Sequence, residues 1–360
     1  MASSVQNNRV STPGNCVCCR TCRMWCWKAF KWLPVMLILA IIIWSYYAYV
    51  IQLCIINIES TVQKCIYLVI HHILLIMFCW SYVRTVFAEI KPIPEKFKLP
   101  ENELEKLLSA ETEDAQRAIL DNYAKELPIV TRTMSGSVRY CNRCVLVKPD
   151  RAHHCSICSR CVLKMDHHCP WVNNCVCFFN YKFFMLFLGY ALVYCIFIMA
   201  TCLPYFIKFW KGGFGEVAST GGYHIVFAFF VAMMFAISLG SLFGYHCYLV
   251  INNRTTLESF RAPMFRGGAD KNGFSIGRFN NFKEVFGNSP NLWLVPVFTS
   301  LGDGCEYPVR REHQLQTFTT PQETHGYESM GTTRSSSESG RESERWRLCP
   351  RKGRTVPQIV

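Results

Sequence analysis

The sequence has few charged residues. Aspartate, glutamate, lysine and arginine make up 18% of the 360 residues, whereas a soluble globular domain carries about 25%. Hydrophobic residues make up 51% and aromatic residues 14%. No internal repeat of 20–50 residues is visible, which argues against a solenoid. The composition also excludes a collagen, a coiled coil and a fully disordered chain, and it favours a membrane protein.

Acidic residues are the scarcer of the charged types. There are 25 of them against 38 lysines and arginines, which gives a formal net charge of +13. An excess of positive charge is typical of nucleic-acid-binding proteins, and it is equally typical of the cytosolic side of membrane proteins. The distribution of the basic residues must distinguish the two classes.

Four apolar stretches are long enough to cross a membrane. The hydrocarbon core is about 30 Å thick, and a helix of about 20 residues spans it. Because these spans carry neither buried carboxylates nor paired half-helices, a transporter or channel has little support. The stretches run approximately from Leu33 to Leu53, Cys65 to Ala88, Phe183 to Phe206 and Tyr223 to Ile251.

Basic residues predict the orientation of the spans. They are frequent in the N-terminal segment, in the long loop between the second and third spans, and after the fourth span, but rare in the two short loops. By the positive-inside rule, both termini and the long loop face the cytosol. We expect no cleavable signal peptide, because the first apolar run is too long for a signal core. This placement explains the positive charge without nucleic acid.

The chain therefore divides into six predicted segments. The long loop contains a predicted amphipathic helix over 101–127, with a buried stripe formed by Leu104, Leu107, Leu108 and Ile119. The last segment is rich in serine, threonine, glutamate and arginine, which predicts a disordered tail. The segments are 1–32 (N-terminal, cytosolic), 33–88 (spans one and two), 89–182 (long loop, cysteine-rich over about 139–182), 183–251 (spans three and four), 252–308 (C-terminal domain) and 309–360 (tail).

Cysteines are concentrated in the long loop. Of the 21 cysteines, eight lie between Cys141 and Cys177, together with four histidines. Because the cytosol is reducing, a disulfide framework is not expected. Cys-x2-Cys pairs followed by further histidines and cysteines are typical of tetrahedral zinc sites. Two zinc ions need eight ligands, so four of the twelve cysteines and histidines are in excess.

Cys169 is the candidate nucleophile among the excess residues. A neighbouring imidazole can deprotonate a thiol, and His167 lies two positions away. Asp166 could then hold the His167 ring in the required tautomer, as in an acid–base–nucleophile triad. The alternative is that Cys169 is a further metal-type or buried cysteine. Spacing by itself does not choose between the two.

The motifs of the loop and its flanks resemble those of one family. In order, they are Cys141-x2-Cys144, Lys148-Pro149-x-Arg151, His154-Cys155, Asp166-His167-His168-Cys169, Pro170-Trp171, Asn173-Asn174-Cys175, Thr255-Thr256-Leu257-Glu258, and Asn281 before Val285-Phe286-Gly287. Over about residues 30–305 the chain closely resembles the DHHC protein S-acyltransferases, or palmitoyltransferases. The implied fold is four transmembrane helices with a cytosolic zinc-binding domain between helices two and three.

The resemblance implies a two-step reaction. A fatty acyl-CoA, palmitoyl-CoA in the first instance, acylates Cys169 with the help of His167 and Asp166, and the acyl group then passes to a cytosolic cysteine of a membrane-associated protein. Two structural zinc ions are implied as cofactors. Their ligands are Cys141, Cys144, His154 and Cys161 at one site, and Cys155, Cys158, His168 and Cys175 at the other.

The resemblance also implies supporting roles for residues outside these sets. Thr256 is expected to hydrogen-bond Asp166. Trp171 is expected to pack beside the thioester, with a structural role as the alternative. Glu258 and Asn281 are expected to brace the C-terminal segment against the catalytic loop. Lys148 and Arg151 are implied contacts for the CoA phosphates, with plain surface charge as the alternative. Ser45 and Tyr194 are expected to close the far end of the acyl slot, whereas without the family they would be interhelical hydrogen-bonding residues.

Some expectations concern individual positions. The family usually has glycine where this chain has Cys177, so a glycine with positive φ would predict a strained turn and reduced activity here. His71, His72 and His246 lie in the spans with no partner carboxylate evident, and we expect them to be packed and neutral. Five cysteines beside the first span could be S-acylated or idle thiols, namely Cys16, Cys18, Cys19, Cys22 and Cys26.

Function and location are bounded by the same residues. The competing interpretation is a membrane-anchored zinc scaffold or a ubiquitin-ligase-like adaptor, but such a module has no use for the excess histidines and cysteines. The expected partners are membrane-associated substrate proteins and the lipid bilayer. The expected location is the Golgi membrane, with the plasma membrane and the endoplasmic reticulum as alternatives. The protein substrates and the oligomeric state stay open.

Overall fold

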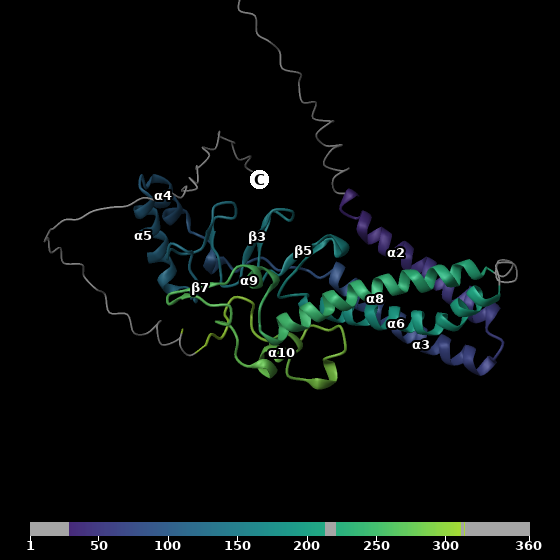
Figure 1. Ribbon diagram of the computed structural model, residues 1–360. Helices are drawn as coiled ribbons and strands as arrows, with labels where there is room; N and C mark the ends of the chain where they lie inside the picture. Colours follow the sequence, from purple (N-terminus) through teal and green to yellow (C-terminus); the bar gives the residue numbers. More distant parts are fainter. Residues whose placement is uncertain (1–28, 213–220, 311–312, 314–360) are drawn as a thin grey trace, which may run out of the picture. The chain divides into compact units, whose positions relative to one another are not determined.

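A computed structural model describes residues 29–212, 221–310 and 313 (Figure 1). Within these ranges four helices are long and apolar enough to cross a membrane, over Leu33–Asn57, Thr61–Val86, Tyr181–Lys211 and Gly222–Ile251. They correspond to α2 (Leu33–Tyr46) with its π-helical continuation η1 (Tyr47–Asn57), α3 (Thr61–Val86), α6 (Tyr181–Gly212) and α8 (Gly222–Ile251). The predicted fold class is confirmed, with the cysteine-rich loop between α3 and α6.

Helix α6 is the centre of this bundle. It packs against both α3 and α8 along much of its length (Figure 1). The buried cluster that unites the spans also includes three residues of the cysteine-rich loop, Cys169, Val172 and Val176. The candidate nucleophile therefore packs against the membrane helices rather than on the far side of the loop.

The cysteine-rich loop contains short hairpins rather than an extended sheet. Three antiparallel pairs follow one another along the chain. They are β1 (Tyr140–Cys141) with β2 (Leu146–Val147), β3 (His153–Cys155) with β4 (Arg160–Val162), and β5 (His167–Cys169) with β6 (Asn174–Val176). Strands of two or three residues cannot enclose a large apolar core, so other bonds must fix the shape of the loop.

The predicted helix over 101–127 is wrong in its extent. The structure has two helices, α4 (Glu101–Ser109) and α5 (Glu113–Tyr123), followed by a short 3-10 turn (Ala124–Glu126). Thr112 caps α5 by accepting a hydrogen bond from the Ala115 N–H at 3.2 Å, and such a cap starts a new helix. Leu107 is buried as predicted, but Leu108 is 76% exposed.

The segment after α8 folds back onto the bundle and the loop. It contains α9 (Thr256–Phe260), the hairpin β7–β8 (Met264–Phe265 and Gly268–Ala269), α10 (Arg278–Phe286) and a 3-10 turn (Pro290–Leu292). The Lys182 ammonium at the start of α6 donates to the Leu292 carbonyl and the Thr299 hydroxyl, both at 2.8 Å. The N-terminal cysteine cluster and the predicted tail, apart from residues 309, 310 and 313, lie outside the described residues.

Candidate functional site

The two faces of strand β5 carry side chains with different chemical roles. Successive side chains of a strand point to opposite sides, so His167 and Cys169 share one face while His168 lies on the other. An extended strand is thus a backbone conformation in which two residues of this spacing can contact each other. On one face a base can meet a thiol, and on the other a histidine can bind metal.

Asp166 and His167 form the first contact of the predicted triad. The His167 Nδ1 lies 2.6 Å from the Asp166 Oδ2. Asp166 is fully buried, and it also accepts hydrogen bonds from the Thr256 N–H at 2.8 Å and the Thr256 hydroxyl at 2.7 Å. The expected Thr256–Asp166 bond is therefore present. It holds the carboxylate from the start of α9.

Hydrogen bonds stabilise the charged forms of Asp166 and His167 against the effect of burial. Burial disfavours the imidazolium, but the hydrogen bond to Asp166 and the interaction with Cys169 outweigh it and raise the pKa of His167 to about 9. Burial likewise disfavours the carboxylate, but the hydrogen bond from His167 keeps the pKa of Asp166 below its usual value. The site therefore favours an ionised Asp166 and a protonated His167, which can stabilise a thiolate at Cys169.

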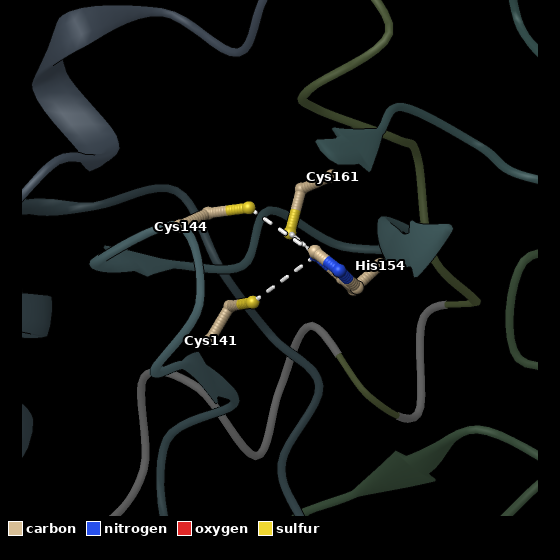
Figure 2. Close-up of side chains that lie close together, drawn as sticks. All are labelled: Cys141, Cys144, His154 and Cys161. Carbon is tan, nitrogen blue, oxygen red and sulfur yellow. Dashed lines mark hydrogen bonds between the residues drawn. The ribbon is translucent and has the colours of Figure 1, made fainter. Parts of the chain in front are cut away.

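The first predicted metal site is assembled from two hairpins. Cys141 and Cys144 come from β1 and its turn, and His154 and Cys161 face each other across β3 and β4. The three sulfur atoms lie 3.6, 3.2 and 3.8 Å from the His154 Nδ1. Figure 2 shows the three cysteine side chains gathered around the His154 ring. Zinc bonds of about 2.3 Å to sulfur and 2.0–2.1 Å to nitrogen place tetrahedral ligands about 3.6 Å apart, so the four atoms fit zinc.

The second predicted metal site repeats this construction one hairpin later. The sulfur atoms of Cys155, Cys158 and Cys175 lie 3.7, 3.5 and 3.6 Å from the His168 Nδ1. The Cys158 and Cys175 sulfurs are 3.6 Å apart, close to the spacing of two thiolates on one zinc ion. Each metal-ligand set therefore joins one hairpin to the next, which supplies the bonds that the short strands lack.

Cys169 belongs to neither ligand set. It is buried within the cluster that includes the membrane helices. The next aromatic residue, Trp171, is half exposed, and its carbonyl accepts a hydrogen bond from the Tyr82 hydroxyl of α3 at 2.9 Å. This bond places the turn after Cys169 against the end of α3 that is nearest to the loop.

Ser45 and Tyr194 contact each other within the helix bundle. The Ser45 and Tyr194 hydroxyl oxygens are 2.9 Å apart. The Tyr194 hydroxyl also lies 3.1 Å from the His71 Nε2, a contact that sequence reasoning missed. His71 is buried as expected, and His72 contacts the Leu68 carbonyl and the Tyr46 hydroxyl. Three polar side chains thus converge at one level of the bundle.

Arg151 is not at the surface. The residue is 2% exposed, and its guanidinium donates to both carboxylate oxygens of Glu258, at 2.8 and 2.7 Å. It also donates to the Asn253 side chain and carbonyl at 2.8 and 2.9 Å. Such a bidentate buried pair is a bracing contact. Arg151 was predicted to contact the CoA phosphates, but in the structure its guanidinium joins the loop to α9.

Lys148 lies instead in a basic cleft. The cleft encloses about 450 Å³ and is lined by residues of the loop, of α9 and of the segment after α9. Arg151 was expected here with Lys148, but the other three arginines of the lining, Arg132, Arg139 and Arg261, were missed from the sequence, although the net charge of +13 was a general signal for them. Among the basic residues of the lining, Arg151 is the one held in the ion pair with Glu258.

Asn281 ties α10 to the end of α8. Its amide group donates to the Ile251 carbonyl at 2.7 Å and to the Ser275 hydroxyl at 2.9 Å, and its side-chain oxygen accepts from the Ile276 N–H at 2.9 Å. Every polar atom of this buried side chain is thereby satisfied. These bonds join α10 to the end of α8, whereas the expected bracing of the C-terminal segment against the catalytic loop by Asn281 stays a prediction.

Cys177 does not strain the backbone in the way the sequence suggested. Among the described residues with positive φ are Val145, Ser159 and Asn173, but Cys177 is not one of them. Its N–H donates to the Asn180 side chain at 2.9 Å, and its own side chain is fully buried. The expected strain is therefore absent, because this position does not need a left-handed conformation.

Comparison with known proteins places these sites in a family. A family model described as DHHC palmitoyltransferase matches residues 135–262. The chain is 55% identical over 285 residues to palmitoyltransferase ZDHHC2 of Danio rerio, covering 79% of this chain and 78% of that protein. It is 52% identical to palmitoyltransferase ZDHHC2 of Homo sapiens (83% and 80% covered) and 48% identical to palmitoyltransferase ZDHHC15 of Xenopus laevis (84% and 87% covered).

Proposed function

The chain belongs to the DHHC palmitoyltransferase family and is a protein S-acyltransferase that uses acyl-CoA, and from this premise we propose that Cys169 carries the acyl group between the two substrates. The single observation that supports this role is the shared face of β5, with Asp166 bonded to His167 at 2.6 Å. A zinc scaffold is not favoured, because the relatives are named palmitoyltransferases.

The first step transfers the acyl group to the enzyme. The Cys169 thiol gives its proton to His167, and the resulting thiolate attacks the thioester carbonyl of acyl-CoA. The carbon–sulfur bond to CoA breaks, and the departing CoA thiolate takes the proton back from His167. Asp166 keeps the ring in the tautomer that this exchange requires and stabilises the imidazolium.

The second step transfers the acyl group to the substrate protein. His167 accepts the proton of the substrate cysteine, whose thiolate attacks the Cys169 thioester. The Cys169 thiolate leaves and is again paired with the imidazolium. Since one thioester is exchanged for another, the reaction needs little driving force, and positioning of the thiols is the main contribution of the protein.

The acyl chain is proposed to lie along a track of aromatic rings. Contacts run from Tyr82 to Phe187, Phe78 and Tyr194, with centroid separations of 5.1, 5.9 and 5.7 Å. From Tyr82 to His71, eleven residues of α3 cover about 16 Å at 1.5 Å per residue. That is about half of the ~30 Å hydrocarbon core, the depth of one leaflet. The Ser45–Tyr194–His71 group would then set the chain length.

The basic cleft is the proposed site for the CoA phosphates. Lys148, Arg139 and Arg261 line it, and phosphate groups favour arginine and lysine partners. The cleft includes Leu257 and Glu258 of α9, the helix whose first residue, Thr256, holds Asp166. A CoA molecule in the cleft would therefore lie close to the catalytic strand. Arg151 is proposed as a brace of this region through Glu258.

The structural zinc ions hold the loop and take no part in the transfer. Both ligand sets are complete with four protein atoms, so neither leaves an open position for a substrate or water. Trp171, half exposed beside Cys169, is proposed to contact the thioester. Glu258 and Asn281 are proposed to brace the C-terminal segment.

Location and segmentation are proposed from the charge pattern. The protein is a multi-pass membrane protein whose substrates are proteins in contact with the lipid bilayer. Both termini and the zinc-ligand loop are proposed to face the cytosol, in a Golgi membrane, with the six segments bounded as the sequence suggested. Protease digestion of sealed microsomes tests the orientation, since cytosolic termini would be cleaved without detergent.

Acylation of Cys169 is tested directly with labelled palmitoyl-CoA. The purified full-length chain should acquire label that hydroxylamine releases, and Cys169→Ser should lose it while retaining two zinc ions per chain. Loss of zinc in that variant would make Cys169 a ligand and would contradict the mechanism. Cys195→Ser, a second thiol within the membrane cluster, is the control that should keep its label.

A further inference from the structure

His246 lies beside the catalytic pair although it is remote from it in the sequence. One ligand atom each of Asp166, His167 and His246 lie within 4.8 Å of one another. The rings of His167 and His246 have centroids 5.8 Å apart. His246 is 1% exposed and belongs to α8. A membrane helix therefore presents a second imidazole to the pair that activates Cys169.

The orientation of His246 is fixed by α6. The Tyr181 hydroxyl, at the first residue of α6, lies 2.9 Å from the His246 Nδ1. A neutral imidazole has one donor and one acceptor nitrogen, so this bond fixes which way the ring is turned. Phe184, one turn later on α6, contacts both imidazole rings edge-on. Its ring centroid lies 5.0 Å from that of His246 and 5.4 Å from that of His167.

The three groups do not form a further metal site. The Asp166 carboxylate already accepts three hydrogen bonds, one from His167 and two from Thr256. The Nδ1 of His246 is taken by Tyr181. A cation would have to replace these bonds, so the arrangement is one of mutually oriented side chains.

We propose that His246, held by the Tyr181 hydroxyl, is a positioning residue that keeps the His167 ring turned toward Cys169. The proposal rests on the proposed role of Cys169. Thr256 holds the Asp166 carboxylate from α9, and His246 and Phe184 confine the imidazole from the two membrane helices. Contacts on both sides therefore restrict the movement of Asp166 and His167. This restriction matters because small displacements of a base strongly reduce its rate of proton transfer.

The test is the single-turnover rate of Cys169 acylation by labelled palmitoyl-CoA in the full-length protein. His246→Phe keeps a ring but removes both nitrogens, and it should lower the maximal rate at least about tenfold with the KM for acyl-CoA within about twofold of its original value. Tyr181→Phe removes one hydroxyl and should lower the rate about threefold. His246→Gln restores a polar group and should recover part of the loss, which a purely space-filling role would not produce.

Two matched controls separate this role from general damage to the bundle. His72→Phe removes a histidine of α3, and Tyr190→Phe removes a hydroxyl of α6 that bonds the Leu294 carbonyl; both should react at the parental rate. Equal rates in His246→Phe, Tyr181→Phe and the controls would overturn the proposal. If His246→Phe loses zinc, the isosteric variant Tyr181→Phe provides the test instead. A parental acylation rate in Tyr181→Phe would then overturn the proposal. An unlabelled parent chain would instead reject the role of Cys169 itself.

Discussion

The hairpins β3–β4 and β5–β6 carry nearly the same residues and have opposite tasks. His153, His154 and Cys155 in the first correspond to His167, His168 and Cys169 in the second, fourteen positions later. The cross-strand pairs also correspond, since His154 faces Cys161 and His168 faces Cys175. Yet Cys155 is placed to bind metal, whereas Cys169 lies free beside a base. The difference must come from the few positions at which the hairpins disagree.

Two of these positions explain the divergence. Cys158 completes a Cys-x2-Cys pair with Cys155, but Val172 stands at the equivalent place after Cys169 and is buried against the membrane helices. Cys169 therefore has no partner thiol to share a metal. Ala152 precedes the first His-His-Cys run and Asp166 the second. Burial and nearby Arg139 lower the pKa of His153 to about 3, while the bond to Asp166 raises that of His167.

The series of metal-ligand sets also ends at the hairpin β5–β6 for a structural reason. Each metal-ligand set combines the Cys-x2-Cys of one hairpin with the histidine and cysteine of the next. After β5–β6 the chain enters α6, and the hairpin that follows later in the described residues, β7–β8, contains neither histidine nor cysteine. Cys169, which corresponds to the metal ligand Cys155, is therefore in neither ligand set. It lies where the loop meets the helix bundle.

The largest contrast is expected from the same substitution in the two hairpins. Cys155→Ser removes one ligand of a structural site, and metal binding contributes on the order of 10 kcal/mol to folding of such small domains. Bound zinc should fall from two to one per chain or below, and the loop should lose its protection from proteases. Cys169→Ser should keep both zinc ions and lose all acylation. Metal analysis with acylation measured on the same samples checks both expectations.

A result in which both variants lose zinc to the same extent would remove the distinction between the hairpins. Cys305→Ser is a suitable control, because this buried cysteine is in neither ligand set.

The next largest effect is expected from making the second hairpin resemble the first. Asp166→Ala reproduces Ala152 and removes the acceptor that orients His167, and loss of the equivalent group in other triads lowers the rate about 10⁴-fold. The acylation rate should fall by about three to four orders of magnitude, with zinc content unchanged. Single-turnover labelling measures it. A loss below tenfold would show that His167 does not depend on the carboxylate.

The sequence revealed the parts of this design that are local. The spans follow from apolar runs, and the ligand sets follow from cysteine spacing together with the family resemblance. The division of 101–127 into two helices could have been found from Thr112 followed by two acidic residues, a helix-start pattern. It was hidden by the apolar periodicity of Leu104 and Leu107, which continues across the break.

The parts that could not be predicted depend on contacts between distant segments. His246 meets Asp166 because α8 packs against α6, and no local pattern encodes that packing. The sequence places Arg151 at an accessible position, as a CoA phosphate contact or alternatively a surface charge, because lysines and arginines are rarely buried. Its partners Asn253 and Glu258 lie about a hundred positions later. The burial of a charge can be recognised only once its partner is placed.

A smaller effect is expected from the contact that supports Asp166. Thr256→Val keeps the shape of the side chain and the backbone N–H bond to the carboxylate, but removes the hydroxyl bond of 2.7 Å. A hydrogen bond to a charged group contributes about 1.5–3 kcal/mol, so the acylation rate should fall by a factor of about 10 to 150. Thr256→Ser, which keeps the hydroxyl, is the matched control. Equal losses in both variants would assign the effect to the methyl group instead.

The smallest effect is expected at Cys177, which corresponds to Leu163 in the first hairpin. Both side chains are buried, so this is a position at which the hairpins agree in character. Cys177→Gly removes a buried thiol and adds backbone freedom, which together should lower the free energy of unfolding by about 1–2 kcal/mol. Because Cys177 has no left-handed backbone to relieve, the acylation rate should stay within about twofold of the parental rate. Thermal unfolding and single-turnover labelling measure the two quantities, and a rate increase of tenfold would show that the cysteine does restrain the catalytic hairpin.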